Sequence, residues 1–254
     1  PLPPLIHIDL DPRNINLNFT VQVGIVADAT PALTQLTDPS IEKGDSQYRE
    51  KLQSVAAETR AQTRERIGPD HANVLDAISA YMDADTFFVR DNTIPGYHWG
   101  NGLLPINNPR GYIYPTSGAI GPGLPLGIGV AIATDKKTIV MHGDGGFMFH
   151  VGELATAAQY QAPIVIIIFN DSGYGVLRGL QHSQFEGRFN GTELFTPDFV
   201  QLATSMGVTG LHADNATELK TRLAEAMTIK GPVLINLNVH NMTPVKGVVT
   251  APGK

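Results

Sequence analysis

The sequence predicts an α/β fold in which a mostly parallel sheet carries helices on both faces. From about residue 71 onward, strand-like and helix-like segments alternate, which is the order typical of parallel sheets. Two strand segments, "PIVIIIF" (163–169) and "PVLINLNV" (232–239), are almost continuously apolar. Strands of this kind are usually buried on both faces. Acid–glycine turns follow two of the predicted strands.

The first 40 residues predict the tail of a second α/β domain. "LIHIDL" (5–10) and "VGIVAD" (23–28) alternate in polarity or are rich in β-formers, so both predict strands. "ATPALTQLTD" (29–38) predicts a helix, with Thr30 as its N-cap and Pro31 in its first turn.

A charged connector is expected next, at residues 41–70. The stretch 41–67 is strongly charged, and Tyr48, Leu52 and Val55 form only a thin apolar stripe at helical spacing. This pattern favours an exposed, partly helical connector. A helix that binds a partner is the alternative.

Residues 71–254 are expected to form the main domain. The segment 71–82 predicts a helix with Val74, Ile78 and Tyr81 on one face. The remaining strands are predicted at 86–90, 137–142, 163–169 and 232–239, and the remaining helices at 151–161, 197–206 and 217–229.

Composition excludes several classes of protein. The chain has 254 residues, a net charge of −6 and no cysteine. Nucleic-acid binding and thiol chemistry are therefore not expected. The uncharged stretch 111–134 contains three prolines and six glycines, which favours a glycine-rich loop entering a helix over a membrane span. No secretory signal is visible, and we expect a cytoplasmic protein without membrane contact.

Two acid–glycine turns carry the strongest chemical signal. Asp144 in "GDGG" follows the strand at 137–142, and Asp171 in "NDSGYG" follows the next strand. Ligands of parallel sheets bind beyond the carboxyl ends of the strands. A helix expected to open around 149–152 can face an anion with its N-terminus. Two carboxylates with phosphate oxygens suit Mg²⁺. Either acid alone is an ordinary turn residue, whereas the pair is more specific.

Common nucleotide motifs are absent or misplaced. "GAIGPG" (118–123) does not follow a clear strand, and no G-x-x-x-x-G-K-[ST] sequence occurs. A dinucleotide-binding Rossmann protein and a P-loop protein are therefore disfavoured.

The pair of turns resembles the signature of thiamine-diphosphate enzymes, usually written GDG…NN. Here "GDG" and "ND" are separated by the 24 positions 146–169. "SGAIGPGLPLGIGVAIA", "GELATAAQY", "YGVLRGLQ" and "GPVLINLNV" also resemble the pyrophosphate-binding domain of the acetolactate synthase, benzoylformate decarboxylase and pyruvate decarboxylase group. The resemblance covers about residues 71–240, and residues 1–40 resemble the end of that group's central domain.

The resemblance implies a site residue by residue. Asp144, Asp171 (where the family usually has Asn) and the Gly173 carbonyl would bind Mg²⁺. Ile120 would be the apolar wedge that keeps the cofactor bent. The implied cofactor-binding residues are Asn92, Thr93, Gly118, Ala119, Ile120, Gly143, Asp144, Gly145, Gly146, Asp171, Gly173, Tyr174 and Gly175. Val176 and Leu180 match substrate-pocket positions. His98, His142 and His150 are expected to be structural.

The resemblance also implies the activity. It points to a thiamine-diphosphate, Mg²⁺-dependent decarboxylase or carboligase of small 2-oxo acids, with cofactor chemistry supplied by thiamine diphosphate. The family's activating glutamate belongs to a pyrimidine-binding domain that these residues do not resemble, so we expect no catalytic residue in this chain. Glu153 is rejected as a substitute because it would oppose phosphate charge.

Several alternatives remain open at this stage. The chain could be a piece of a longer enzyme, which the resemblance of residues 1–40 favours, or a subunit that meets a complementary chain carrying the pyrimidine domain. A homodimer or homotetramer is expected in the first case. A flavin-containing (FAD) relative, a CoA-ester lyase and a non-catalytic diphosphate-binding module are the other readings. The chain alone is expected to be inactive.

Overall fold

The structure, a computed structural model, describes residues 3–37 and 46–249. Contacts divide the chain into two units, Pro1–Val55 and Ala56–Lys254, which are described separately. Some predictions lie outside the described residues: the helix end at residue 38, the start of the connector at 41–45, and residues 250–254 of the main domain.

Among its described residues, the first unit contains a two-stranded parallel sheet, a 3₁₀ turn (Pro12–Asn14), an α-helix, and the first ten residues of a second, longer helix. Strand β1 (Ile6–Asp9) pairs with β2 (Val23–Val26), and α1 (Ala29–Leu36) follows. The N-cap of α1 is Asp28, whose side chain accepts from the Thr30 backbone N–H, so the prediction of Thr30 as the cap was wrong. No residue of β1, β2 or α1 is buried. Their apolar side chains therefore remain at the surface.

Helix α2 (Ser46–Ser79) contains a kink at Gly68. Gly68 has φ 79° and ψ 169°, and Pro69 follows it. A positive φ suits glycine, and a proline cannot continue the hydrogen-bond ladder of the preceding helix. Before the kink the residues of the predicted stripe are exposed. After it Val74 and Ile78 are buried, as their predicted helix face requires.

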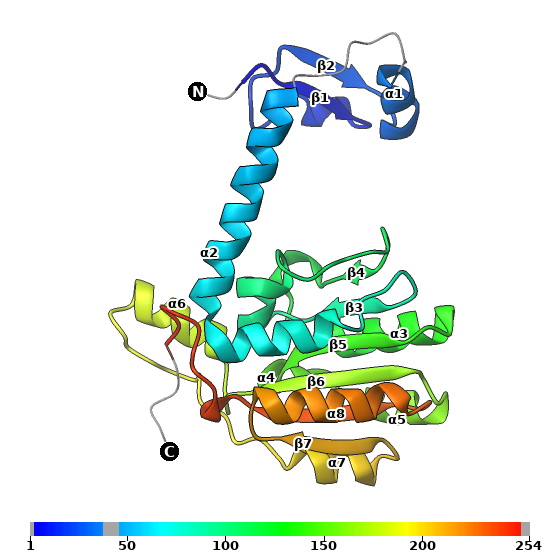
Figure 1. Ribbon diagram of the computed structural model, residues 1–254, viewed down its shortest axis with the longest axis vertical. Coiled ribbons are helices and arrows are strands. Elements are labelled where there is room, and N and C mark those ends of the chain that lie inside the picture. Colours follow the sequence, from blue (N-terminus) through cyan, green and yellow to red (C-terminus); the bar gives the residue numbers. More distant parts are fainter. Residues whose placement is uncertain (1–2, 38–45, 250–254) are drawn as a thin grey trace. The chain divides into compact units, whose positions relative to one another are not determined.

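The second unit is built on a six-stranded sheet in which every strand pairs in parallel (Figure 1). The spatial order is β4-β3-β5-β6-β8-β7. The bounds are β3 (Phe87–Arg90), β4 (Tyr112–Ile113), β5 (Thr138–Gly143), β6 (Ile164–Asn170), β7 (Thr209–Ala213) and β8 (Val233–Asn238). The four predicted strands of this unit are all present. The edge strands β4 and β7 were missed because neither contains an apolar run.

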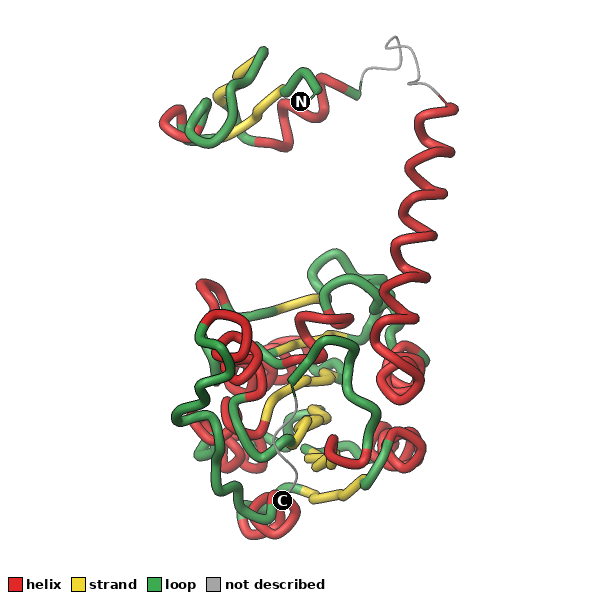
Figure 2. The backbone as a smooth tube through the Cα atoms, turned by 90° about the vertical axis from the view of Figure 1, so that its left-hand side faces the viewer, coloured by secondary structure: helices red, strands yellow, loops and turns green. Residues whose placement is uncertain are grey.

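Helices cover both faces of this sheet (Figure 2). Along β6, Ile164, Ile166 and Ile168 belong to one core cluster, and Val165 and Ile167 belong to the other. This alternation is the period of two that a strand imposes. The first cluster includes residues of α3 (Gly123–Thr134), α5 (Glu153–Gln159) and α7 (Phe199–Ser205). The second includes residues of α2 and α8 (Ala216–Thr228). The predicted fold class is confirmed.

The chain becomes helical earlier than expected after β5. Helix α4 (Asp144–Phe147) begins directly at the acid, with Gly143 as its N-cap, and a 3₁₀ turn (Met148–His150) leads to α5. The helix expected to open around 149–152 is α5, whose N-cap is Gly152. The short α4 before it was not predicted, because a four-residue helix is too short to leave a periodic pattern. Among the described helices, none is long and apolar enough to cross a membrane.

We predict that His71 makes the stability of the second unit depend on pH. His71 is 5% exposed, and its Nδ1 lies 3.3 Å from the donating Trp99 Nε1. Burial lowers the pKa of His71 to about 4. Because the folded pKa lies below the unfolded value, His71 contributes full stability above pH ~6.5. That contribution falls by about 2 kcal/mol by pH 5.

Urea unfolding followed by fluorescence measures this effect, since Trp99 is the single tryptophan. In the control variant His71→Gln, an amide oxygen replaces the titrating acceptor. The loss of stability between pH 8 and pH 5 should be smaller in the variant than in the wild type. An equal loss in both proteins would contradict the prediction.

Candidate functional site

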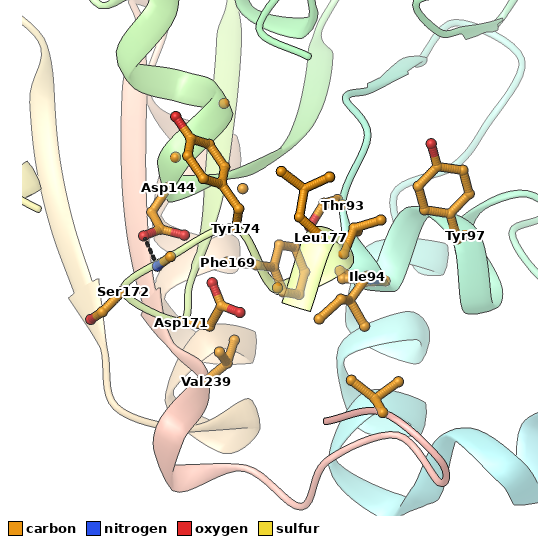
Figure 3. Close-up of a pocket in the computed structure, with 18 of the residues that line it drawn as sticks. Thr93, Ile94, Tyr97, Asp144, Phe169, Asp171, Ser172, Tyr174, Leu177 and Val239 are labelled. Carbon is orange, nitrogen blue, oxygen red and sulfur yellow. Dashed lines mark hydrogen bonds between the residues drawn. The ribbon is translucent and has the colours of Figure 1, made fainter. Parts of the chain in front are cut away.

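A pocket of about 850 Å³ opens at the carboxyl ends of the strands in the second unit. Residues that follow β3, β5, β6 and β8 line it, together with α6 (Gly175–Gln184) (Figure 3). This is the edge at which ligands of open parallel sheets bind.

The structure brings nearly all of the predicted site residues together in this pocket. Those lining it are Asn92, Thr93, Gly118, Ile120, Gly143, Asp144, Gly145, Gly146, Asp171, Gly173, Tyr174, Gly175, Val176 and Leu180. Ala119 does not line the pocket, but its carbonyl accepts a hydrogen bond of 2.6 Å from Asn92 Nδ2. The three motifs that carried the prediction therefore meet in space.

The 118–123 loop is held by a buried carboxylate that the sequence analysis did not consider. Asp91 is fully buried, and its Oδ2 accepts from the backbone N–H groups of Gly121 at 3.0 Å and Gly123 at 2.7 Å. A charge-assisted bond of this kind is stronger than a neutral one. The sequence offered one signal for this role: Asp91 comes directly after the predicted strand that ends at Arg90, at the edge of the sheet where ligands bind.

Arg90 orients the neighbouring Asn92. Arg90 is 5% exposed and donates through Nη1 to Asn92 Oδ1 at 2.7 Å. The guanidinium lies 5.3 Å from the Tyr97 ring centre and 4.9 Å from that of Tyr114, within cation–π range. With its oxygen engaged by Arg90, the Asn92 amide directs its N–H to Ala119. The end of β3 thus fixes the loop bearing Ile120.

The three histidines expected to be structural do not line the pocket. His142 is fully buried, and burial lowers its pKa. Its Nε2 lies 3.3 Å from the Gly121 carbonyl and 3.4 Å from Asp91 Oδ2. Two other histidines, His71 and His240, do line the pocket, and nothing in the sequence pattern around them marked this position.

Asp144 and Asp171 form the polar end of the pocket (Figure 3). Asp144 is fully buried and its Oδ2 accepts from the Gly173 N–H at 3.0 Å. Its Oδ1 has no hydrogen-bond partner among the described residues. Burial, and then the charge of Asp171, raise the pKa of Asp144 to about 8. Burial also raises the pKa of Asp171, against the opposing charge of Arg178.

Glycines are required in the loop after β6 because neighbouring atoms approach too closely for a side chain. A Cβ at Gly173 would overlap the Thr192 carbonyl oxygen, and one at Gly175 would overlap the Asp171 carboxylate. The same loop is tied to a later segment: Tyr174 N–H donates to the Thr192 carbonyl at 2.8 Å. The position of Asp171 is therefore set by backbone packing.

The acid pair suits a magnesium ion, which takes part of its ligands from water and phosphate. It does not suit a metal that needs all of its ligands from side chains. Among the described residues there is no cluster of three or more His, Cys, Asp or Glu side chains able to hold a metal. Mg²⁺ needs no such cluster, because it commonly takes one or two carboxylates together with water and phosphate oxygens. The unpaired Oδ1 of Asp144 is the kind of buried oxygen that a cation would satisfy.

The rest of the pocket wall is mainly apolar. Helix α6 contributes Val176, Leu177 and Leu180, of which Leu177 was not predicted. The segment after β8 contributes a second apolar group that the sequence analysis missed: Val239, Met242, Val245 and Val248. These residues recur at every third position, which matches neither the 3.6-residue period of an α-helix nor the two-residue period of a strand, so these patterns gave no signal for them.

The fold and the paired acid turns together define a class, that of thiamine-diphosphate-binding domains. The family model for the thiamine pyrophosphate enzyme C-terminal TPP-binding domain matches residues 96–237. This chain belongs to that family, which confirms the resemblance found in its motifs.

Individual relatives agree with this assignment. The catalytic subunit of mitochondrial acetolactate synthase from Saccharomyces cerevisiae is 30% identical over 257 residues, covering 96% of this chain and 37% of the relative. The acetolactate synthase large subunit of Haemophilus influenzae is 31% identical, with 92% and 43% covered. The chain spans about two fifths of the length of these curated relatives.

A solved structure has a similar fold. The thiamine diphosphate-dependent 4-hydroxybenzoylformate decarboxylase of Rhodococcus jostii RHA1 gives a TM-score of 0.71 at 26% identity. The match covers 92% of this chain and 44% of that protein.

We predict opposite effects of alanine at two glycines of α6. Gly175→Ala should lower the free energy of unfolding by about 1–3 kcal/mol, because its Cβ would displace the Asp171 carboxylate. Gly179→Ala is the matched control, since nothing lies within 4 Å of the added Cβ. It should raise stability by up to ~1 kcal/mol through helix propensity. Guanidinium unfolding measures both, and equal effects would refute the close approach.

Proposed function

We propose that this chain is the diphosphate- and metal-binding portion of a thiamine-diphosphate, Mg²⁺-dependent decarboxylase or carboligase of 2-oxo acids. The observation that carries the proposal is the fully buried Asp144, whose Oδ1 is unpaired among the described residues and which lies beside Asp171. A buried, unpaired carboxylate is costly unless a ligand compensates it.

The charge of the pocket supports a metal requirement. The described residues that line it include Asp144, Asp171 and Glu193, but no Lys or Arg. A diphosphate group entering this pocket alone would meet three carboxylates and no Lys or Arg side chain among the described lining residues. A divalent cation between the carboxylates and the diphosphate removes that repulsion.

Each predicted residue has a proposed task. The carboxylates of Asp144 and Asp171 and the Gly173 carbonyl hold the cation. Gly145, Gly146 and Tyr174 lie along the diphosphate, with Asn92 and Thr93 near the same end. Gly143 and Gly175 border the metal-binding loops and let them approach the ligand.

The 118–120 loop is proposed to hold the other half of the cofactor. Ile120 would support the bend between the two rings, the Gly118 carbonyl would accept from the 4′-amino group, and the Ile120 N–H would reach the ring. Ala119 is proposed to act through its hydrogen bond with Asn92, which fixes the loop. When bound, thiamine diphosphate supplies the electron sink for loss of CO₂ from a 2-oxo acid.

The substrate is proposed to lie against Val176 and Leu180. Both side chains line the pocket on α6, next to the exposed Leu177. They offer apolar contact and no charge, which suits the side chain of a small 2-oxo acid.

The activating glutamate is proposed to come from outside these residues. Glu153 does not line the pocket, and its carboxylate accepts from Thr156 Oγ1. Glu193 does line it, but Glu193 pairs with Gly173 through a β-bridge and so belongs to the metal end. A pyrimidine-binding domain of a longer protein, acting across a homodimer or homotetramer, or a complementary chain would supply the glutamate.

The domain assignment forms part of the same proposal. Residues 1–40 are the end of a central domain, 41–70 a connector, and 71–254 the pyrophosphate-binding domain. The surface position of the apolar residues of β1, β2 and α1 supports the first assignment, because isolated two-stranded sheets are marginally stable.

We predict that Asp144→Asn strongly weakens metal-dependent cofactor binding. The variant keeps an acceptor for the Gly173 N–H but removes the charge that attracts the cation. Calorimetric titration with thiamine diphosphate in the presence of Mg²⁺ should show at least an approximately tenfold loss of affinity. Glu225→Gln, which removes one carboxylate from the exposed face of α8, is the charge-matched control. Unchanged affinity in Asp144→Asn would eliminate the metal assignment.

We also predict that the 254-residue chain releases no CO₂ from 2-oxo acids when supplied with thiamine diphosphate and Mg²⁺. Its described residues provide no glutamate for the pyrimidine end of the cofactor. A coupled assay for CO₂ checks this prediction. Robust turnover by the purified chain would overturn the proposed location of the glutamate, whereas cofactor binding without turnover, even in the complete protein, would favour a non-catalytic diphosphate-binding module.

A further inference from the structure

Arg178 on α6 is a buried cation next to the acid pair. Its side chain is 1% exposed, and its Nη1 lies 3.2 Å from Asp171 Oδ2. Nη2 donates to the Thr192 carbonyl at 3.4 Å, and Nε has no partner among the described residues. Arginine remains protonated in proteins. A permanent positive charge therefore lies directly behind one of the proposed metal ligands.

Arg178 does not line the pocket. It can act on a pocket ligand only through Asp171 and through its electric field. With both acids ionised, Asp144, Asp171 and Arg178 carry a net charge of −1 instead of the −2 of the acids alone. Because Asp144 and Arg178 are buried and the Asp171 side chain is only 19% exposed, solvent screens their interactions weakly.

We propose that Arg178 is a positioning residue that weakens the hold of the Asp144–Asp171 pair on a free divalent cation, so that the cation binds firmly only together with a diphosphate. This inference rests on the proposed function of the same site. Repulsion between Arg178 and the cation opposes binding of the metal alone. The negative charge of a diphosphate compensates that repulsion when both ligands are present.

A purely structural role for Arg178 leads to the opposite expectation. If Arg178 only braced Asp171 and the Thr192 carbonyl, removing it would loosen the loop and weaken metal binding. If Arg178 sets the charge, removing it strengthens the binding of metal alone. The sign of the change therefore separates the two roles.

Asp171→Asn supplies the complementary change. The amide keeps an oxygen for the metal, but Arg178 is left without its carboxylate and the charge of the cluster rises to zero. In the double variant Asp171→Asn/Arg178→Met the charge returns to −1. Metal affinity should follow this charge and not the number of intact native contacts.

Electron paramagnetic resonance on the full 254-residue chain measures the binding of Mn²⁺ alone. It tests whether Mn²⁺ affinity ranks the variants by the net charge of the Asp144–Asp171–Arg178 cluster. Arg178→Met should bind Mn²⁺ at least about tenfold more tightly than the wild type, and Asp171→Asn at least about tenfold more weakly. The double variant should bind within about threefold of the wild type. Adding thiamine diphosphate should tighten Mn²⁺ binding more in the wild type than in Arg178→Met.

The exposed pair Arg64–Asp76 provides matched controls. Arg64→Met and Asp76→Asn change the net charge of the chain by the same amounts and should leave Mn²⁺ affinity unchanged. Circular dichroism checks folding of every variant. If Arg178→Met fails to fold, Asp171→Asn and the double variant decide the question, and equal affinities in these two would overturn the inference.

Two failures are distinguishable. If wild-type chain binds Mn²⁺ with thiamine diphosphate, but Arg178→Met binds Mn²⁺ alone no more tightly, the role of Arg178 is overturned and the proposed function stands. If the wild type binds no Mn²⁺ even with thiamine diphosphate, the metal assignment fails and the inference fails with it.

Discussion

The buried carboxylate of Asp144 is the constraint on which the rest of the site depends. It lies at the end of a central strand with no solvent exposure, and only one of its oxygens is paired among the described residues. Such a group is unfavourable in the protein alone, as its raised pKa reflects. A positively charged ligand next to the unpaired oxygen of Asp144 would compensate the cost of burying this carboxylate. Asp171 and the glycines of the following loop lie around this carboxylate, held there by close backbone contacts with the segment at Thr192.

The surrounding backbone maintains this arrangement through contacts between separate loops. The Gly173 N–H donates to Asp144, and Tyr174 pairs with the 192–194 segment through the main chain. On the opposite side, Asp91 binds two N–H groups of the 118–123 loop, and Arg90 orients Asn92 toward the same loop. Two sets of hydrogen-bonded loops thus meet at the carboxyl edge of one parallel sheet. This geometry suits an elongated ligand with an anionic end near the acids and an apolar end near α6.

The acid at position 171 has a charged partner inside the protein. The resemblance places an asparagine where this chain has Asp171, which adds a negative charge beside Asp144. The structure pairs that extra charge with the buried Arg178. The acid is therefore one half of an ion pair, and its effect on a bound cation cannot be judged without its partner. Buried charges are rarely tolerated singly, and a compensating charge behind the ligand is one physical solution.

The sequence by itself determined the α/β class, the four longer strands of the main sheet and the two acid turns, because strand periodicity, apolar runs and glycine turns are local properties. It also resembled its family closely enough to indicate the cofactor. Tertiary structure alone decided the edge strands β4 and β7, the start of α4 at Asp144, and the roles of Asp91, Arg178 and the wall after β8. Each of these depends on hydrogen bonds, packing or charge between residues far apart along the chain. Local sequence patterns do not predict such long-range contacts.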